Sequence, residues 1–338
     1  MSSTLKLAFL GCGGIARFHL RGIRADAPRI AVTAAIDVDP AKAGAFAEET
    51  GAAPFSSLDE ALTDGDFDAV DIMLPHDLHE EAAVRCFEAG RHVLLEKPMA
   101  PTLDACERIL AAARKAGTVF MVAENAQYWP EVVRARDAIE AGAIGEPIAA
   151  RARFANNPRR DFFLDPEEAR PWRFNAGRTG GGIVVDGGSH WIRPLRMWLG
   201  EVDAVVATLG RPLHQMEGES LAHALLRFRS GPTATFEAFY GEGIFGPSEL
   251  WRITGHEGEI AVGGSSGAVL YNDTHRDGEQ LMEPAGYAAS FGPELADFAH
   301  AVLDGAPLQA GPEESLGELR TALAIYRSAA SGGWEEVW

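Results

Sequence analysis

The sequence predicts an α/β protein of two domains, a doubly wound parallel sheet followed by an α/β domain whose open sheet is mainly antiparallel. Its 338 residues correspond to two domains of roughly 150 residues each. Short apolar runs alternate with helical patterns in the first third of the chain, and the rhythm changes afterwards. We therefore assign residues 1–123 to the first domain and residues 124–338 to the second.

The first domain has the pattern of repeated βαβ units. Buried parallel strands are nearly continuous apolar runs, and the candidates are Leu5–Leu10, Ile30–Ile36, Ala69–Leu74, Val93–Leu95 and Val119–Val122. The helical patterns between them are Ile15–Ala27, Pro40–Thr50, Leu78–Ala89 and Leu103–Ala116. Strands that alternate with helices in this way predict a parallel sheet with helices on both faces.

The second domain shows the apolar–polar alternation of antiparallel strands with one polar face. The predicted strands are Ile148–Phe154, Ala222–Phe228, Thr233–Tyr240, Leu250–Thr254 and Glu259–Val262. Ser230-Gly231-Pro232 marks a hairpin-like turn between two of them. Helices are expected at about Pro130–Ala141, Pro293–Leu303 and Pro312–Ala330.

The charge of the chain excludes several classes of partner. Thirty Lys and Arg residues against 49 Asp and Glu residues give a net charge of −19. Such a field repels phosphodiester backbones and anionic lipids, so neither nucleic acid nor a membrane surface is expected as a partner. No apolar run approaches the ~20 residues of a membrane span.

The three cysteines, Cys12, Cys86 and Cys106, form no Cys-x-x-Cys pair. This spacing favours neither a disulfide framework nor a thiolate zinc site, and we expect no metal. The first apolar run is too short for a signal peptide. The expected location is therefore cytoplasmic.

A glycine-rich turn follows the first predicted strand and opens a helix. It contains Gly11, Gly13, Gly14, Ile15 and Ala16, in the spacing G-x-G-x-x-A. In this motif the first glycine permits a tight turn, and the second lets a pyrophosphate approach the N–H groups of the helix N-terminus. The small last residue lets helix and strand pack closely, and the whole motif predicts a dinucleotide site.

Asp37 ends the second predicted strand, where an acidic side chain accepts hydrogen bonds from the adenosine ribose hydroxyls. Its charge also repels a 2′-phosphate, and the next residue, Val38, supplies no arginine. NAD is therefore favoured over NADP. Capping of the following helix is the alternative role for Asp37, but Asp39 before Pro40 fits that role better.

Glu96-Lys97-Pro98 ends the predicted strand Val93–Leu95. Residues at the carboxyl ends of such strands face the ligand crevice. A lysine there can stabilise the alkoxide-like charge that develops on a substrate oxygen during hydride transfer. A solvated strand end is the alternative.

Asp186 and His190 follow the triplet Gly180-Gly181-Gly182 and share one face if the stretch is helical. An imidazole can take a proton from a carbinol at neutral pH, and a carboxylate can orient the ring or hold a second hydroxyl. The glycines indicate close backbone approach. A capping aspartate and a buried structural histidine are the alternatives.

These motifs, in this order, resemble the Gfo/Idh/MocA family, which includes glucose–fructose oxidoreductase and inositol dehydrogenase. The resemblance covers essentially the whole chain. It implies an N-terminal Rossmann domain that binds NAD and a C-terminal sheet that carries the substrate pocket and an oligomer interface, hence a homodimer or homotetramer. The motifs that carry it are the glycine-rich turn, Pro75-x-x-x-His79, Gly90 to Pro98, and Asp186-x-Gly-x-His190 before Trp198-Leu199-Gly200.

The resemblance also implies residue roles. The catalytic lysine of the family corresponds to Lys97, and its Asp/His pair corresponds to Asp186 and His190. His190 would take the hydroxyl proton, Lys97 would polarise the same oxygen, and Asp186 would orient the substrate and the histidine. The expected cofactor-binding residues are Gly11, Gly13, Gly14, Ile15, Ala16, Asp37, Leu74, Pro75, His79, Glu96 and Lys97; a structural role at a helix start is the alternative for His79.

The chain departs from the family pattern at two positions. His76 follows Pro75 where family members usually have asparagine, and Arg193 stands three residues after His190 where aspartate is often found. Pro194 then follows and can kink the helix. None of these residues belongs to the expected catalytic set, but they can reshape the pocket wall.

Further substrate-binding candidates lie after the last predicted parallel strand and in the irregular stretch 155–179, the kind of loop that carries binding groups. Arginines can recognise a carboxylate or phosphate, with surface charge pairs as the alternative, and a core position is the alternative for the tryptophan. The candidates are Asn125, Gln127, Asn156, Arg159, Trp172 and Arg173, besides Asp186 and His190.

The predicted function is hydride transfer between NAD and a secondary alcohol or ketone of a sugar, cyclitol or glycoside. Some relatives use transient oxidation for redox-neutral glycoside cleavage or epimerisation, which is the second hypothesis. The third is a non-catalytic NAD-binding sensor, because function depends on sites rather than on folds. The presence of Lys97, Asp186 and His190 argues against the sensor.

Overall fold

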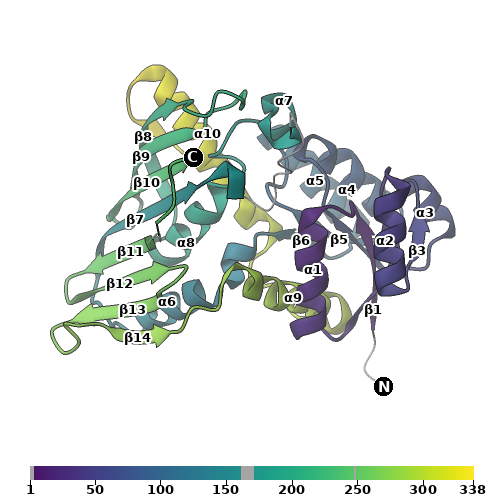
Figure 1. Cartoon of the computed structure of the whole chain (residues 1–338), viewed down its shortest axis with the longest axis horizontal. Coiled ribbons are helices and arrows are strands. Elements are labelled where there is room, and N and C mark those ends of the chain that lie inside the picture. Colours follow the sequence, from purple (N-terminus) through teal and green to yellow (C-terminus); the bar gives the residue numbers. More distant parts are fainter. Residues whose placement is uncertain (1–3, 161–170, 247–248) are drawn as a thin grey trace. The chain divides into compact units, whose positions relative to one another are not determined.

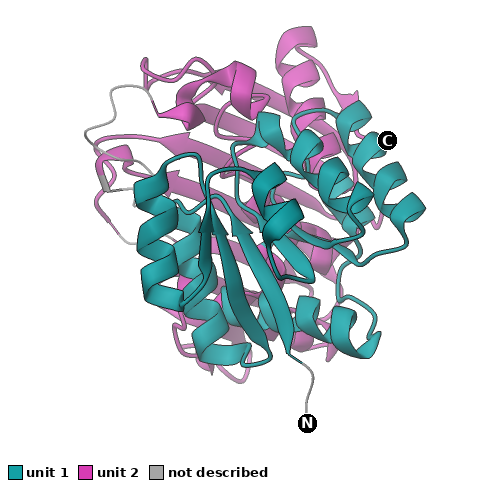
Figure 2. Cartoon of the chain, turned by 90° about the vertical axis from the view of Figure 1, so that its right-hand side faces the viewer, with its two compact units in different colours: residues 1–124, 291–316 teal, residues 125–290, 317–338 magenta. Residues whose placement is uncertain are grey.

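The computed structural model describes residues 4–160, 171–246 and 249–338. The chain divides into two compact units (Figure 2). Unit 1 contains residues 1–124 and 291–316, and unit 2 contains residues 125–290 and 317–338.

Unit 1 is built on a parallel sheet, which over the described residues has six strands in the order β3-β2-β1-β4-β5-β6 (Figure 1). Every neighbouring pair is parallel. The order reverses direction at β1 and β4, which is the arrangement of a doubly wound sheet, and this prediction is confirmed. The strands are β1 Leu5–Leu10, β2 Ile30–Ile36, β3 Ala53–Phe55, β4 Ala69–Ile72, β5 His92–Glu96 and β6 Phe120–Ala123.

The helices of unit 1 follow the expected alternation. They are α1 Gly14–Asp26, α2 Pro40–Thr50, α3 Leu58–Asp64, α4 His79–Glu88, α5 Leu103–Ala116 and α9 Phe291–Asp304, with the 3-10 turns η1 His76–Leu78 and η6 Pro312–Glu314. The apolar pattern did not indicate β3 or α3. β3 has only three residues, of which two are exposed, and α3 has seven, so both are too short to give a clear apolar pattern.

Helix α9 packs with unit 1, although our sequence boundary assigned its residues to the second domain. A Cβ at Gly22 of α1 would lie 2.8 Å from the backbone nitrogen of Gly292 in α9. The two helices therefore approach closely because both present glycine at the contact. Sequence periodicity cannot show which helix a distant segment will meet.

Unit 2 is built on a mixed, mainly antiparallel sheet, as predicted. Over the described residues it has nine strands in the order β14-β13-β12-β11-β7-β10-β9-β8-β15, and β7 and β10 pair in parallel. The patterns of β8, β13, β14 and β15 were not recognised in the sequence. The strands are β7 Pro147–Asn156, β8 Val202–Gly210, β9 Leu221–Phe228, β10 Thr233–Tyr240, β11 Glu249–Gly255, β12 Gly258–Gly263, β13 Gly267–Asn272, β14 Glu279–Met282 and β15 Glu335–Glu336.

Helices of unit 2 pack against one face of this sheet. Trp198 of α8 and Trp251 of β11, for example, meet edge-on with ring centroids 6.1 Å apart. The helices are α6 Pro130–Glu140, α7 Ala176–Thr179, α8 Ser189–Leu199 and α10 Ser315–Ser331, and the 3-10 turns are η2 Asn125–Tyr128, η3 Pro158–Arg160, η4 Trp172–Phe174 and η5 Tyr287–Ser290. No helix in the described ranges is long and apolar enough to cross a membrane.

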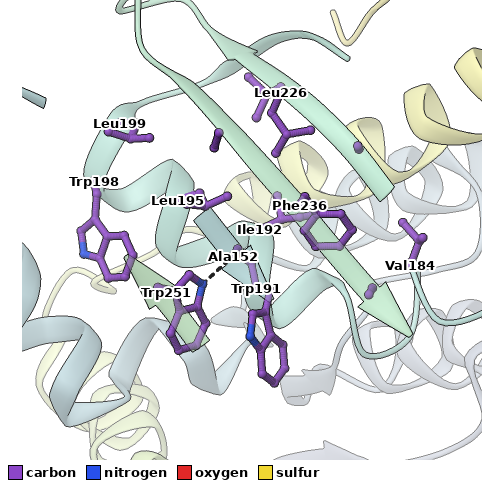
Figure 3. Close-up of a cluster of buried hydrophobic side chains, with 14 of the residues drawn as sticks. Ala152, Val184, Trp191, Ile192, Leu195, Trp198, Leu199, Leu226, Phe236 and Trp251 are labelled. Carbon is purple, nitrogen blue, oxygen red and sulfur yellow. Dashed lines mark hydrogen bonds between the residues drawn. The ribbon is translucent and has the colours of Figure 1, made fainter. Parts of the chain in front are cut away.

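The core of unit 2 is centred on the fully buried side chain of Trp251 (Figure 3). Its ring is stacked on Trp191 at a centroid distance of 5.3 Å and meets Trp129 edge-on at 5.6 Å. The indole N–H of Trp251 donates to the Trp191 carbonyl at 3.1 Å. The indole thus combines a large apolar surface with a satisfied polar group, as a buried tryptophan requires.

We predict that Trp251→Ala lowers the free energy of unfolding by about 3–5 kcal/mol, because it removes a fully buried aromatic side chain and leaves a cavity. Urea unfolding followed by circular dichroism measures this change. The matched control is Trp334→Ala, whose side chain is exposed and whose loss should cost less than about 1 kcal/mol. Equal losses in the two variants would contradict the prediction.

Candidate active site

The glycine-rich turn joins β1 to α1 in unit 1. Gly11 has a φ of +96°, and a Cβ there would lie 2.5 Å from the carbonyl oxygen of Met73. A Cβ at Gly13 would meet no heavy atom of the described residues within 4 Å. Over the same residues, no side chain caps the start of α1, which begins with Gly14 and Ile15. The open helix N-terminus suits a pyrophosphate, because its first N–H groups have no helical acceptor.

Asp37 stands at the end of β2 beside this turn. Its Oδ2 accepts from the Cys12 N–H at 2.8 Å, and its Oδ1 accepts from the Asp39 N–H at 2.9 Å. Asp39 in turn caps α2, accepting from the Ala41 N–H at 2.9 Å, as expected. Each carboxylate oxygen has two lone pairs, so Asp37 retains acceptor capacity for ribose hydroxyls. The next residue, Val38, is 91% exposed and has no positive charge that could bind a 2′-phosphate. The residues at this edge therefore fit NAD.

His79 links the chain segments that follow β4 and β5. It is fully buried, and its Nδ1 and Nε2 lie 2.9 Å from the Pro98 carbonyl oxygen and 2.8 Å from the Leu74 carbonyl oxygen. The ring is therefore enclosed by protein, which favours the structural alternative for His79. Leu74, Pro75 and Lys97 are partly exposed at these strand ends, where a nicotinamide is expected in a doubly wound fold.

Glu96, the last residue of β5, is held from two sides. Its Oε2 accepts from the backbone N–H of Lys97 at 3.0 Å, and its Oε1 lies 3.2 Å from Nε2 of the fully buried His19. Nδ1 of His19 lies 2.7 Å from Oδ2 of the buried Asp71. Glu96 is therefore enclosed by protein contacts that fix the strand end from which Lys97 projects.

The two carboxyl groups around the His19 imidazole favour its protonated form. Burial by itself lowers the pKa of His19, but the carboxylates of Asp71 and Glu96 outweigh it and raise the pKa well above its usual 6.5. Both ring nitrogens then donate hydrogen bonds. Glu294 of α9 is also fully buried nearby, and burial, opposed by His19 and reinforced by Glu96, raises the pKa of Glu294 well above its usual range. This shift favours the neutral form of the Glu294 carboxyl, which limits the negative charge of this group.

In unit 2, Asp186 and His190 are both buried, with 7% and 8% exposure. The expected shared helical face is not formed, because α8 starts only at Ser189. Residues 183–188 instead form turns, in which the Gly188 N–H donates to the Ile183 carbonyl at 2.7 Å. Nη1 of Arg173 lies 2.5 Å from Oδ1 of Asp186. The structure thus brings together Arg173 and Asp186, two residues that the sequence singled out separately.

The ring of His190 faces Tyr287, with ring centroids 6.3 Å apart. The Tyr287 carbonyl accepts from Ser290 at 2.7 Å, and the Ser290 hydroxyl accepts from Nδ2 of Asn125 at 2.7 Å. This chain of contacts connects Asn125 to the histidine. Gln127 is buried in the same 3-10 turn as Asn125. Tyr287 and Ser290 carry no motif and were missed in the sequence.

The remaining candidates are more dispersed. Arg159 forms a bidentate pair with Glu242, with distances of 3.1 and 3.0 Å on an exposed surface, which favours the surface-pair alternative. Trp172 is half-buried, not in the core, and the guanidinium carbon of Arg173 lies 4.5 Å from its ring centroid. Asn156 ends β7, where its side chain accepts from the Asn157 N–H at 2.8 Å.

Arg193 is buried against Glu318 of α10, with Nη2 to Oε2 at 3.1 Å, which favours a structural role for this arginine. Among the described residues, no cluster of three or more His, Cys, Asp or Glu could hold a metal ion. Burial raises the pKa of each of the three cysteine thiols to about 12, which leaves them unreactive as nucleophiles.

The parallel sheet, the open helix terminus and Asp37 define an NAD-binding oxidoreductase of two units. The family model described as "Oxidoreductase family, NAD-binding Rossmann fold" matches residues 5–124. The model described as "GFO/IDH/MocA C-terminal domain" matches residues 132–261. The chain belongs to the GFO/IDH/MocA family of oxidoreductases.

Several known proteins are similar over nearly the whole chain. A 1,5-anhydro-D-fructose reductase of Ensifer adhaerens is 29% identical, over 97% of each protein. A D-xylose 1-dehydrogenase (NADP(+)) of Haloferax volcanii is 28% identical, over 88% of this chain and 90% of that protein. The structure of GenD2 from gentamicin A biosynthesis, in complex with NAD, is 27% identical with a TM-score of 0.83, over 99% of this chain and 97% of that one.

The raised pKa of His19 predicts a stability that depends on pH. The unfolded chain loses this proton near pH 6.5, whereas the folded chain retains it. The stabilisation is therefore complete below pH 6.5 and is lost as the pH rises through the raised folded-state pKa. In that window the free energy of unfolding should fall by up to about 1.4 kcal/mol per pH unit from this group.

Urea unfolding between pH 6 and 9 measures the slope, and ring-nitrogen NMR reports the proton directly. Two ring N–H signals should persist above pH 7 and be missing from His19→Gln. They should remain in His275→Gln, a control in which the replaced ring is about two-fifths exposed. A ring with a single N–H at pH 7 would show that His19 is not the buried cation.

Proposed function

We propose that the chain transfers a hydride between NAD and a secondary alcohol or ketone of a sugar, cyclitol or glycoside. The sugar chemistry is supported by relatives named as 1,5-anhydro-D-fructose reductase and D-xylose 1-dehydrogenase. The observation that carries the proposal is the Arg173–Asp186 pair, four residues along the chain from the buried His190. Together, a carboxylate, the guanidinium that balances its charge and an imidazole can bind a substrate hydroxyl and take its proton.

The residues of unit 2 divide the proton chemistry between them. The guanidinium of Arg173 balances the charge of Asp186, so the carboxylate serves as a hydrogen-bond acceptor that orients a substrate hydroxyl. His190 is then the general base that takes the proton of the reacting hydroxyl in oxidation and returns it in reduction. Tyr287 restricts the histidine ring by its edge-on contact.

The residues of unit 1 hold the cofactor and the second group on the reacting oxygen. Gly13, Gly14 and Ile15 would receive the pyrophosphate, and Asp37 the adenosine ribose. When bound, NAD supplies the hydride acceptor. Lys97 donates a hydrogen bond to the oxygen whose negative charge develops in the transition state. Glu96 directs this lysine by holding its backbone N–H.

A substrate panel tests the reaction. We expect absorbance of NADH to grow with NAD and D-xylose, myo-inositol or methyl glucoside, or to fall with NADH and 1,5-anhydro-D-fructose. Lys97→Ala and His190→Ala should each lower kcat by at least about a hundredfold, the scale of one general acid–base group. Unchanged turnover in both variants would remove these residues from the mechanism, and product without net NADH would support redox-neutral chemistry instead.

The preference for NAD depends on Asp37. Replacement by alanine removes two charge-assisted hydrogen bonds to ribose, so the Kd for NAD should rise by about tenfold to a hundredfold. The difference between the Kd values for NADP and NAD should become smaller. Titration calorimetry measures both affinities, with Asp39→Ala as the control, because this residue caps α2. Unchanged Kd values for both dinucleotides would refute the role of Asp37.

A further inference from the structure

Glu219 lies in the connection between β8 and β9 and receives three consecutive N–H groups. Its carbonyl oxygen accepts from Ile183 at 2.9 Å. Its Oε2 accepts from Gly182 and its Oε1 from Val184, both at 2.9 Å. Tyr326 of α10 donates its hydroxyl to Oε1 at 2.9 Å. One residue therefore holds the backbone of the 182–184 turn from both its main chain and its side chain.

The glycines around this turn are explained by the same contacts. A Cβ at Gly181 would lie 2.1 Å from the Tyr326 hydroxyl, and one at Gly182 would lie 2.0 Å from the Glu219 carbonyl oxygen. A Cβ at Gly218 would lie 2.6 Å from the Gly182 nitrogen. The glycine-rich stretch before Asp186 thus admits Glu219 and Tyr326, not a ligand.

The held turn leads directly to Asp186. The backbone N–H of Asp186 donates to the Gly182 carbonyl at 3.2 Å. Since the residues from 183 to 188 form turns and not a helix, no regular hydrogen-bond ladder fixes the aspartate. Besides its pair with Arg173, the position of Asp186 therefore depends on how the 182–184 turn is anchored.

The connection between β8 and β9 also holds the segment that carries Arg173. The N–H of Glu217 donates to the Phe174 carbonyl at 2.9 Å, and its carboxylate accepts from the Ala176 N–H at 3.2 Å. Residues 217–219 thus contact both the 3-10 turn that carries Arg173 and the turn that carries Asp186.

We propose that Glu219 is a positioning residue for the reaction. It holds the turn before Asp186, so that the Asp186 carboxylate stays paired with Arg173 at the position four residues before His190. This inference rests on the proposed function. Glu219→Gln is the sharpest variant, because it keeps the shape but places an amide N–H₂ against a backbone N–H donor. Misplacement of a reacting group by about 1 Å can cost about a hundredfold in rate.

We expect Glu219→Gln to lower kcat by about tenfold to a hundredfold with the panel substrate that turns over fastest. The Kd for NAD should be unchanged, because unit 1 holds the dinucleotide. Glu237→Gln is the matched control, since Glu237 pairs with Arg153 on β7 at 3.0 Å, and its kcat should stay within about twofold of wild type. Tyr326→Phe, which removes one hydroxyl, should also lower kcat, but by a smaller factor than Glu219→Gln.

A double-mutant cycle separates positioning from general destabilisation. If Glu219 acts through Asp186, adding Glu219→Gln to Asp186→Asn should lower kcat less than about twofold further. A full multiplicative loss in the double variant would overturn the proposal. A kcat for Glu219→Gln that equals that of wild type would overturn it as well.

Hydrogen exchange gives a readout that needs no substrate. Amides of residues 182–188 should exchange faster in Glu219→Gln and Tyr326→Phe than in wild type or Glu237→Gln, and unchanged exchange would refute the anchoring. Failure of the proposed function has a different signature, in which Asp186→Asn and His190→Ala retain full turnover whatever Glu219→Gln does.

Discussion

One buried contact joins three elements of the NAD-binding unit, because the imidazole of His19 lies between two buried carboxyl groups. His19 comes from α1, Asp71 from β4 and Glu96 from β5. Buried charges are costly unless they are paired and hydrogen-bonded. The pairing of His19 with both acids therefore favours the observed packing of α1 on the sheet. One interaction thus couples the helix that begins at the dinucleotide turn to the strand β5, which ends just before Lys97.

In the second unit, carboxylates likewise link separate elements, because they accept hydrogen bonds from backbone N–H and guanidinium groups. Glu318 of α10 contacts Arg193 and Arg196, which lie in the middle and last turn of α8. Glu219 anchors the turn that leads into the same helix. Asp186 and His190 therefore lie in a segment whose two ends are held by hydrogen-bonded carboxylates, which limits the movement of the two side chains relative to each other.

The sequence predicted the parallel half of the fold well, because buried parallel strands are continuous apolar runs and the dinucleotide motif has a defined context. Lys97, Asp186 and His190 were singled out from motif spacing and family resemblance, and their roles stay predictions. The groups that hold them were not found. Asp71 gave a weak signal as the single charged residue in a buried run, but its partner His19 lies on another element 52 positions away. Such pairings are set by tertiary packing, which no local pattern records.

Glycine-rich stretches show how one sequence signal arises from different physical causes. Gly11 is required by the Met73 carbonyl, whereas Gly13 faces open space at a helix terminus. Gly181 and Gly182 are required by Tyr326 and Glu219, although their sequence suggested close approach of a ligand. Only a glycine whose missing Cβ faces open space leaves room for a ligand. The dinucleotide turn meets this condition at Gly13, and the second glycine cluster supports the site indirectly, by admitting the residues that hold it.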